Sequence, residues 1–394
     1  MRNAAIPAVL PVYKRIDVMF ERGEGVWLES SDGRRFLDFG AGIAVTGLGH
    51  SHPHLVKALQ EQAARVWHVS NLYRIQPLER LSDRLVANSF AETVFVCNSG
   101  AEAMEACIKM ARRYHHGAGN PHKKRIITFE GSFHGRTMAT ISAAGGTRLT
   151  EGFEPLLEGF DHLPFGDHDA LKQAITPETG AIMVEPIQGE GGIRPVPTQC
   201  LEGLRELCDE HDLLLIFDEV QCGTGRTGKL FAHEHSGVAP DILGVAKGLG
   251  NGMPIGACLA TARAAGAMER GTHGSTFGGN PLATTVANAV LDVILADGFF
   301  DRVEASGERL ISGLNELSRN HPAVIEEIRG QGLMLGLRVV PANTEFAAAC
   351  MEQELLVVPA ADNIVRLLPP LIIGDSEIDE GLRRLETVVK RFAS

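Results

Sequence analysis

"LLLIFDEV", residues 213–220, opens with five apolar residues and then places two acids where the apolar run ends. Similar short runs occur elsewhere in the chain: "TVFVC" at 93–97, "RIITF" at 125–129, "AIMVE" at 181–185 and "ILGVA" at 242–246. Helical patterns separate them, among them "AEAMEACIKMARRY" at 101–114 and "QCLEGLRELCDEH" at 199–211. Runs that are apolar on both faces and alternate with helices indicate buried, mostly parallel strands of an α/β sheet.

The ends of the chain have a different pattern from this central region. "VWLESSDGRRFLDF" at 26–39 predicts two short strands around a Ser-Asp-Gly turn, and the spacing at 54–66 and 77–90 predicts helices. After Pro281 come two helical patterns, at about 282–296 and 301–319, then a strand-rich part and a last helix from about Ser376. We expect an N-terminal segment (1–44) that packs with a small α+β domain (286–394), and a large domain at 45–285.

Composition excludes several classes of protein. The 394 residues are enough for two sub-structures around a large core, with 44% apolar and 22% charged residues as in soluble globular proteins. The net charge is −12 and no block is rich in Lys or Arg, which argues against nucleic-acid and anionic-membrane binding.

We predict a cytoplasmic protein from three features of the sequence. The seven cysteines are scattered and include no C-x-x-C pair, we recognise no signal peptide, and no apolar run is long enough for a membrane helix.

Ligands of open α/β sheets bind beyond the carboxyl ends of the strands, and the polar motifs of this chain cluster there. Asp218 stands where "LLLIF" ends, although an acid at that place can also be a helix cap or part of a core salt bridge. "NSGAEA" at 98–103 follows a strand and opens a helix, whose free N–H groups and dipole suit a phosphate as well as an ordinary cap. Gly100 would let the phosphate approach.

Three further motifs carry polar groups in apolar or glycine-rich surroundings. "FEGSFHGRT" at 129–137 offers Phe133 and Arg136, which suit a planar ligand and a carboxylate, or else are a packed ring and a surface cation. "HGSTFGGNP" at 273–281 holds the hydroxyls of Ser275 and Thr276. "IVRLLPP" at 364–370 places Arg366 in an apolar strand, where burial demands a carboxylate from Glu190 or from a substrate.

"AKGLGNGMPIGA" at 246–257 combines Lys247 with four glycines. Lysine is costly to bury and glycine weakens a helix or strand, so this combination indicates close backbone approach to a ligand and an amine that points at it.

Two kinds of motif resemble known binding motifs, but their context or spacing does not support that function. "GTGRTG" at 223–228 matches the dinucleotide fingerprint G-x-G-x-x-G, but "DEVQC" separates it from the strand and "KLFAHEH" is a poor helix opening. The histidine-rich stretches "HSHPH", "HHG" and "HEH" have no zinc spacing, so we predict no metal site. A nicotinamide-dependent dehydrogenase is therefore disfavoured.

The remaining motifs together describe one ligand. A phosphate fits "SGA" and Thr276, a planar ring fits Phe133, and a ring nitrogen that must stay protonated fits Asp218. An aldehyde fits the amine of Lys247. Pyridoxal 5′-phosphate has all four requirements.

With these motifs, the sequence resembles the class III (ornithine-type, fold type I) aminotransferases. Seven further motifs besides the lysine stretch carry the resemblance, in order along the chain: "GAGIAVTGLGH", "NSGAEA", "FHGRT", "VEPIQGEGG", "DEVQCGTGRTG", "HGSTFGGNPLA" and "RLLPPL". The resemblance implies a fold type I architecture, with a mostly parallel sheet flanked by helices and a smaller domain built from both ends of the chain. It also implies a homodimer with shared active sites, in which Thr276 reaches the phosphate of the neighbouring subunit.

The resemblance implies a role for each matching residue. Lys247 and Asp218 are the expected catalytic residues: Lys247 bonds the aldehyde and shuttles a proton, and Asp218 pairs with the ring nitrogen. The expected cofactor-binding set is Ser99, Gly100, Ala101, Phe133, Asp218, Glu219, Val220, Gln221, Lys247 and Thr276. Arg136 and Ser275 are expected to contact the acylated substrate, whereas Arg366 holds the α-carboxylate of glutamate and pairs with Glu190 when that carboxylate is absent.

The expected substrate follows from the absence of a tyrosine in the early glycine-rich segment. Ornithine enzymes of this class hold a free α-amino group with a tyrosine in the early glycine-rich segment, and "FGAGIAVTGLGH" has none. This favours amino transfer from N2-acetyl-L-ornithine to 2-oxoglutarate by a ping-pong mechanism, a step of arginine biosynthesis. Succinylornithine and N-succinyl-diaminopimelate stay open as substrates, ornithine and 4-aminobutyrate less so. The rival hypotheses are a racemase or decarboxylase on the same cofactor and a binding protein without activity.

Overall fold

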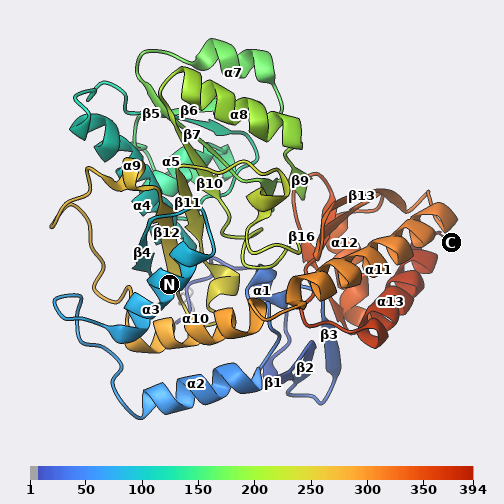
Figure 1. The fold of residues 1–394 in the computed structure, drawn as a ribbon. Helices are drawn as coiled ribbons and strands as arrows, with labels where there is room; N and C mark the ends of the chain where they lie inside the picture. The colour runs from blue at the N-terminus through green and yellow to red at the C-terminus, as the bar shows by residue number, and fades with distance from the viewer. Residues whose placement is uncertain (1–7, 394) are drawn as a thin grey trace, which may run out of the picture.

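The structure is a computed structural model that describes residues 8–393. Its centre is a seven-stranded sheet in the order β4-β12-β11-β10-β7-β5-β6 (Figure 1). In that order the strands span Thr93–Cys97, Gly256–Ala260, Ile242–Val245, Leu214–Asp218, Thr179–Val184, Arg125–Phe129 and Phe160–Leu163. Only β12 runs antiparallel to its neighbours, so the predicted mostly parallel sheet and the fold class are confirmed.

Both faces of this sheet are buried, as the apolar runs predicted. On β10, Leu214 and Ile216 pack into one cluster with helix α4 (Gly100–Gly117) and helix α5 (Met138–Ala144). Leu215 and Phe217 point to the opposite face, into a larger cluster that includes helix α8 (Thr198–Glu210). Of the shorter helices, α6 (Thr147–Thr150) packs on α5, α7 (His168–Ala174) on the edge strand β6, and α9 (Ala262–Ala265) on α4 and β12.

Strand β12 is a finding that the sequence pattern did not predict. Four of its five residues, "GACLA", are small, and none is a β-branched or aromatic residue of the kind typical of strands. A contact with a distant segment explains why a strand forms here. A Cβ atom at Gly256 would lie 2.4 Å from the carbonyl oxygen of Ser99, so only glycine lets β12 pair with β4 at this position. The antiparallel β12 closes the sheet against β4 and brings the segment after Lys247 beside the start of α4.

Long helices join the large sheet to a smaller α+β part. Helices α2 (Pro53–Ala63) and α3 (Gln76–Ala87) pack on α10 (Pro281–Ile294), and α11 (Phe299–Asn320) leads away from it (Figure 1). The second sheet has the order β13-β14-β17-β16, with bounds Ile325–Gln331, Met334–Val339, Ile364–Leu367 and Val358–Pro359. Helices α11, α12 (Asn343–Glu352) and α13 (Asp375–Ala393) accompany this sheet.

The two ends of the chain share a third sheet. Its order is β1-β2-β3-β15, with bounds Phe20–Glu24, Trp27–Ser30, Arg35–Asp38 and Leu355–Leu356.

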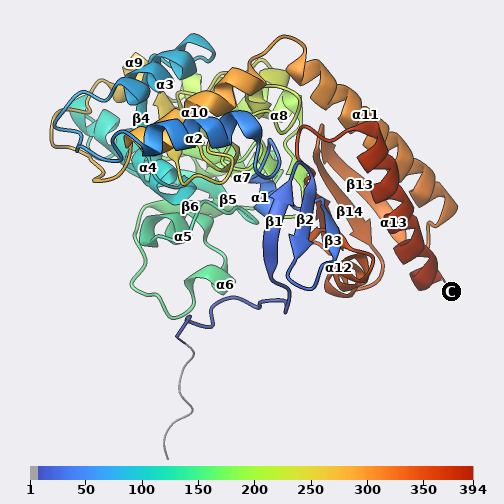
Figure 2. The same cartoon turned by 90° about the horizontal axis from the view of Figure 1, so that it is seen from below.

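The predicted domain boundary at 285/286 falls inside helix α10, and the three predicted domain limits remain a prediction. Between β3 and α2, the short element α1 (Ala41–Ala44) has positive φ at all four residues, 45°, 61°, 67° and 61°. Residues 8–19, which precede β1, lie on the outside of the molecule and are mostly exposed (Figure 2).

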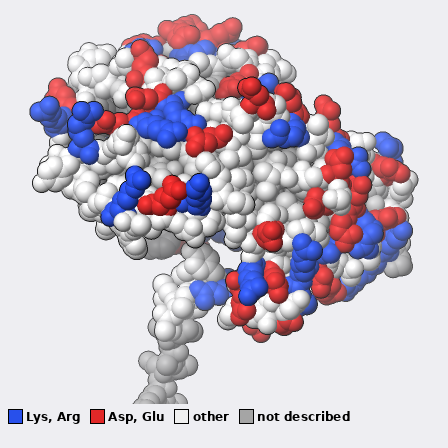
Figure 3. Space-filling view, turned by 60° about the horizontal axis from the view of Figure 1, so that its bottom comes forward, with Lys and Arg blue, Asp and Glu red and all other residues white. Residues whose placement is uncertain are grey.

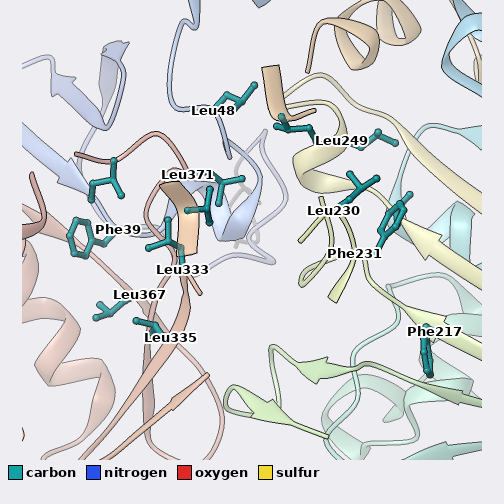
Figure 4. Packing of buried hydrophobic residues seen from close by; sticks show 14 of the residues in the cluster. Phe39, Leu48, Phe217, Leu230, Phe231, Leu249, Leu333, Leu335, Leu367 and Leu371 are labelled. Carbon is teal, nitrogen blue, oxygen red and sulfur yellow. The ribbon is translucent and has the colours of Figure 1, made fainter. Parts of the chain in front are cut away.

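The large and small parts meet through leucine side chains. Leu335 and Leu367 of the small sheet, with Leu333 just before β14, lie on one side of the junction, and Leu230 and Leu249 lie on the other, with Leu371 near the middle (Figure 4). A further small ladder pairs β8 (Ile187–Gln188) with β9 (Arg194–Pro195), and two 3-10 turns, η1 (Ala232–His235) and η2 (Lys247–Leu249), lie in the loops. Among residues 8–393, no single helix is long and apolar enough to cross a membrane. Helices α10 and α11 reach the necessary length and apolar character only when taken together, and the pair is bent by 73°.

Candidate active site

A cavity of about 370 Å³ lies at the carboxyl edge of the large sheet. Four segments line it: the start of α4, the loop after β5, the end of β10 and the loop that carries η2. Nine of the predicted site residues line this cavity: Ser99, Gly100, Ala101, Phe133, Arg136, Asp218, Val220, Gln221 and Lys247. Val45 and the segment Gly252–Ile255 complete part of its wall.

One end of the cavity is the N-terminus of α4. Ser99 is the N-cap, and its hydroxyl accepts the N–H of Glu102 at 3.2 Å. The first N–H groups of a helix have no partner within the helix, and those of Gly100 and Ala101 belong to this turn. A Cβ atom at Gly100 would lie 2.6 Å from Cγ1 of Val220, so glycine is required for the helix end to approach β10. The geometry suits a bound phosphate.

The other end of the cavity holds a buried carboxylate. Asp218 is the last residue of β10 and only 3% exposed. Its Oδ1 accepts the N–H of Val220 at 3.0 Å, and its Oδ2 lies 2.8 Å from Nδ1 of His134. Burial lowers the pKa of His134, but the hydrogen bond and charge of Asp218 outweigh burial and raise it above the usual value. Asp218 is therefore oriented toward the cavity by two fixed donors.

Lys247 begins the 3-10 turn η2 and has a positive φ of 43°. Burial lowers the pKa of its amine to about 8; the neighbouring charge of Arg366 acts in the same direction, and that of Glu190 opposes it. Two of the four glycines in this stretch, Gly250 and Gly256, are required by close approach of the protein's own backbone. A Cβ atom at Gly250 would lie 2.0 Å from the carbonyl oxygen of Met253, which is closer than any side chain allows.

Arg366 is almost completely buried, with 1% exposure, in strand β17. Its Nη1 donates to Oε1 of Glu190 at 2.6 Å and to Oε1 of Gln221 at 3.1 Å. The carboxylate that its burial demanded is thus supplied by Glu190, which is itself half-buried. Since Gln221 lines the cavity, this ion pair adjoins the space beside Lys247.

Phe133 and Arg136 lie at the cavity wall in the loop after β5. The guanidinium of Arg136 is 5.3 Å from the ring centroid of Phe133, and the side chain of Arg136 is exposed. This places a cation at the mouth of the cavity and an aromatic face inside it.

Five predicted residues lie outside the cavity lining. Two of them are the paired Glu190 and Arg366 described above, and the other three are Glu219, Ser275 and Thr276. The carboxylate of Glu219 accepts the N–H groups of Ala232 and His233, so it faces away from the cavity. Ser275 uses its hydroxyl to accept Nδ2 of Asn98 at 3.1 Å, and Thr276 is exposed.

Two buried residues of the site were missed by sequence reasoning. His134 binds Asp218, and Glu185 accepts the N–H groups of Phe133 at 2.9 Å and Gly189 at 3.2 Å. Burial, together with the nearby charge of Asp218, raises the pKa of Glu185 to about 7. The signal was available in part, since Glu185 directly follows the buried strand β7, and Asp218 likewise stands at the carboxyl end of β10.

Within residues 8–393, no group of three or more His, Cys, Asp or Glu residues could hold a metal ion, and all seven cysteines are free. The arrangement instead fits pyridoxal 5′-phosphate, with helix N–H groups for the phosphate, Phe133 for the ring, Asp218 for the ring nitrogen and Lys247 for the aldehyde. These residues define the site of a pyridoxal-phosphate-dependent enzyme.

Comparison with known proteins gives the family. The family model "Aminotransferase class-III" matches residues 10–389, and the chain belongs to this family of pyridoxal-phosphate-dependent aminotransferases. The acetylornithine aminotransferase of Mesorhizobium japonicum is 58% identical over 98% of this chain and 97% of its own length. A Pseudomonas aeruginosa protein named succinylornithine transaminase/acetylornithine aminotransferase is 48% identical over 99% of this chain and 95% of its own.

A solved structure agrees with the sequence comparison. The N-acetylornithine aminotransferase of Stenotrophomonas maltophilia superposes with a TM-score of 0.85 and is 41% identical. The match covers 96% of this chain and 97% of that structure.

Proposed function

We propose that this enzyme transfers the terminal amino group of N2-acetyl-L-ornithine to 2-oxoglutarate, and the reverse, in arginine biosynthesis. The observation that carries the proposal is the near-full-length similarity, at 58% identity, to a protein named for this activity. The absence of a tyrosine from residues 39–50 supports it, because an acylated α-amino group needs no such partner.

Each of the residues around the cavity would have a separate role in the reaction. The bound cofactor supplies an electron sink that stabilises negative charge at the substrate carbon. Nζ of Lys247 would hold the cofactor in the resting enzyme and, once released, would move a proton to and from that carbon. Asp218 would keep the ring nitrogen protonated, Phe133 would orient the ring, and the start of α4 would bind the phosphate.

The pair of Arg366 with Glu190 would allow two different substrates to alternate. With acetylornithine bound, Glu190 would keep the buried guanidinium paired at 2.6 Å. With glutamate or 2-oxoglutarate bound, the substrate carboxylate would take the place of Glu190. Such a replaceable partner suits a ping-pong transaminase and disfavours a racemase or decarboxylase, which acts on one substrate.

We also propose a homodimer as the working unit. Apolar side chains are exposed in the loop that holds Thr276, at Phe277, and in the segment that contains Trp67, Leu72 and Tyr73, and exposed apolar patches mark interaction surfaces. Asn71 ties the two segments together by donating to the carbonyl oxygens of Ser275 and Gly278. Thr276 would reach the phosphate site of the second copy from this surface.

Half-reaction kinetics test the proposed substrate. The cofactor-loaded enzyme is mixed with acetylornithine, succinylornithine, ornithine or N-succinyl-diaminopimelate, and loss of the visible absorption band is followed with time. We expect acetylornithine to react fastest and succinylornithine to react measurably, because a pocket separates close analogues by only about 1–3 kcal/mol. A faster reaction with free ornithine would refute the assignment, and product formation without 2-oxoglutarate would favour the racemase or decarboxylase.

A further inference from the structure

The loop "GTGRTG", residues 223–228, is buried at the junction of the large and small parts of the molecule. Arg226 is 2% exposed, and its Nη1 donates to the main-chain carbonyl oxygens of Leu333, at 3.2 Å, and Pro369. The N–H of Leu333 donates back to the carbonyl oxygen of Arg226 at 3.1 Å. No ion pair joins Arg226 to a carboxylate within residues 8–393, and burial lowers the pKa of its guanidinium to about 10 although the charge of Asp38 opposes this.

A buried cation without a carboxylate partner is costly, so a packing role alone is a poor explanation for it. An apolar side chain of similar volume would fill the same space without that cost. The guanidinium, however, presents several donors in one plane and can bind carbonyl groups of two separate segments at once.

Both segments that Arg226 binds adjoin Arg366. Pro369 follows Arg366 by three residues at the end of strand β17. Leu333 directly precedes strand β14, in which Gly336 is the register partner of Arg366. Arg226 therefore binds the segment that follows the strand with Arg366 and the segment that precedes the neighbouring strand.

The same loop also contacts the segment that carries Lys247. A Cβ atom at Gly248, the residue after Lys247, would lie 3.2 Å from Cβ of Thr224. Around these contacts, Leu249 and Leu230 on the large part face Leu333 and Leu371 on the small part (Figure 4). Residues 224–226 thus connect the backbone next to Lys247 with the backbone next to Arg366.

We propose that Arg226 is a positioning residue that fixes Arg366 relative to Lys247 and so sets the affinity of the enzyme for its dicarboxylate substrate. The proposal rests on the proposed function, in which Arg366 binds glutamate and 2-oxoglutarate. Arg226 itself is not among the residues that line the cavity.

The test measures binding of glutarate, a dicarboxylate that has no amino or keto group and cannot react. Isothermal titration calorimetry gives its Kd for the cofactor-loaded wild type and for Arg226→Gln, Arg226→Lys and Arg302→Gln. The last is a matched control, because Arg302 is an exposed arginine on α11. The KM for the amino donor and the melting temperature are measured in parallel.

We expect Arg226→Gln to raise the glutarate Kd about tenfold or more, the size of effect typical of a lost charged hydrogen bond. The KM for the amino donor should change less than about threefold, since that substrate does not need Arg366. Arg226→Lys, which keeps the charge and can still donate to carbonyl groups, should recover part of the glutarate affinity. Arg302→Gln should match the wild type.

Two results would overturn the proposal: an unchanged glutarate Kd in both Arg226 variants, or an equal loss of affinity for glutarate and the amino donor. A purely structural role would lower the melting temperature without this selectivity. If Arg226→Gln does not fold, the intermediate Kd expected for Arg226→Lys carries the test. A wild type that binds glutarate but does not react with acetylornithine refutes only the proposed substrate, whereas a wild type that binds no glutarate refutes the role of Arg226.

Discussion

The fold places the amine of Lys247 where its pKa is lowered, as the reactive role that we propose for it requires. An exposed lysine is almost entirely protonated at neutral pH, and a protonated amine cannot attack an aldehyde. Burial at the cavity wall lowers its pKa to about 8, so a substantial fraction of the amine is neutral near physiological pH. The same burial disfavours the charged form in the folded protein, where the pKa lies below the ordinary value of 10.5.

The first prediction concerns the pH dependence of cofactor capture. Cofactor-free enzyme should bind pyridoxal 5′-phosphate faster as the pH rises through about 8, and the rate should level off above it, because the neutral amine is the nucleophile. The unfolded chain binds more protons than the folded one between about 8 and 10.5, so cofactor-free enzyme should also gain stability with pH there. Stopped-flow absorbance measures the rate, and a rate that is flat between pH 7 and 9 would contradict the lowered pKa.

At the scale of elements, the site depends on strand ends that meet a helix start. The sequence predicted the buried strands, the position of Asp218 and the helix that "NSGAEA" opens, because each follows from a local apolar or capping pattern. It also predicted that Arg366 needs a carboxylate, since an unpaired buried guanidinium is unfavourable.

Other parts could not be predicted because they depend on contacts between distant segments. Glu185 accepts the N–H of Phe133, which lies 52 positions earlier, and no local pattern indicates this contact. Strand β12 has mostly small residues and no β-branched ones, and it forms because it fits between β4 and β11. Glu219 follows Asp218 directly, so its side chain points the opposite way and binds His233 instead.

The second prediction tests the contact between α4 and β10. The Gly100→Ala variant would place a Cβ atom 2.6 Å from Val220, so one of the two segments must shift. We expect cofactor binding to weaken by about 1–2 kcal/mol, within the usual cost of overpacking. A titration of cofactor-free enzyme, followed by absorbance, measures this loss.

The double variant Gly100→Ala/Val220→Ala is the control for that prediction. Val220→Ala removes the atom that causes the clash, so the double variant should recover most of the lost affinity. Unchanged affinity in Gly100→Ala, or no recovery in the double variant, would show that this contact does not shape the phosphate site.

At the scale of the whole molecule, the surface charge and the exposed apolar residues indicate what the protein contacts. On the face shown in Figure 3, Lys and Arg side chains lie among Asp and Glu side chains and form no continuous basic area. Apolar side chains are exposed instead before β1, as at Leu10 and Tyr13, and around Phe277. A second copy of the chain is the partner that the proposed dimer supplies for these surfaces.

The third prediction follows from a site shared between two copies. If Thr276 completes the phosphate site of the partner, Lys247→Ala and Thr276→Ala should each be impaired alone at limiting cofactor. A mixed dimer contains one site with both residues intact, so mixing the variants after dissociation should restore about a quarter of wild-type activity. Activity that stays at the mean of the two separate variants would refute the shared site.

The most direct test of the account asks which side chain bonds the cofactor. The purified enzyme is reduced with borohydride in the presence of pyridoxal 5′-phosphate, digested and analysed by mass spectrometry. The account predicts a phosphopyridoxyl group on Lys247 alone, and loss of the visible absorption band in Lys247→Ala. A label on another lysine, or the same absorption band in Lys247→Ala, would contradict it.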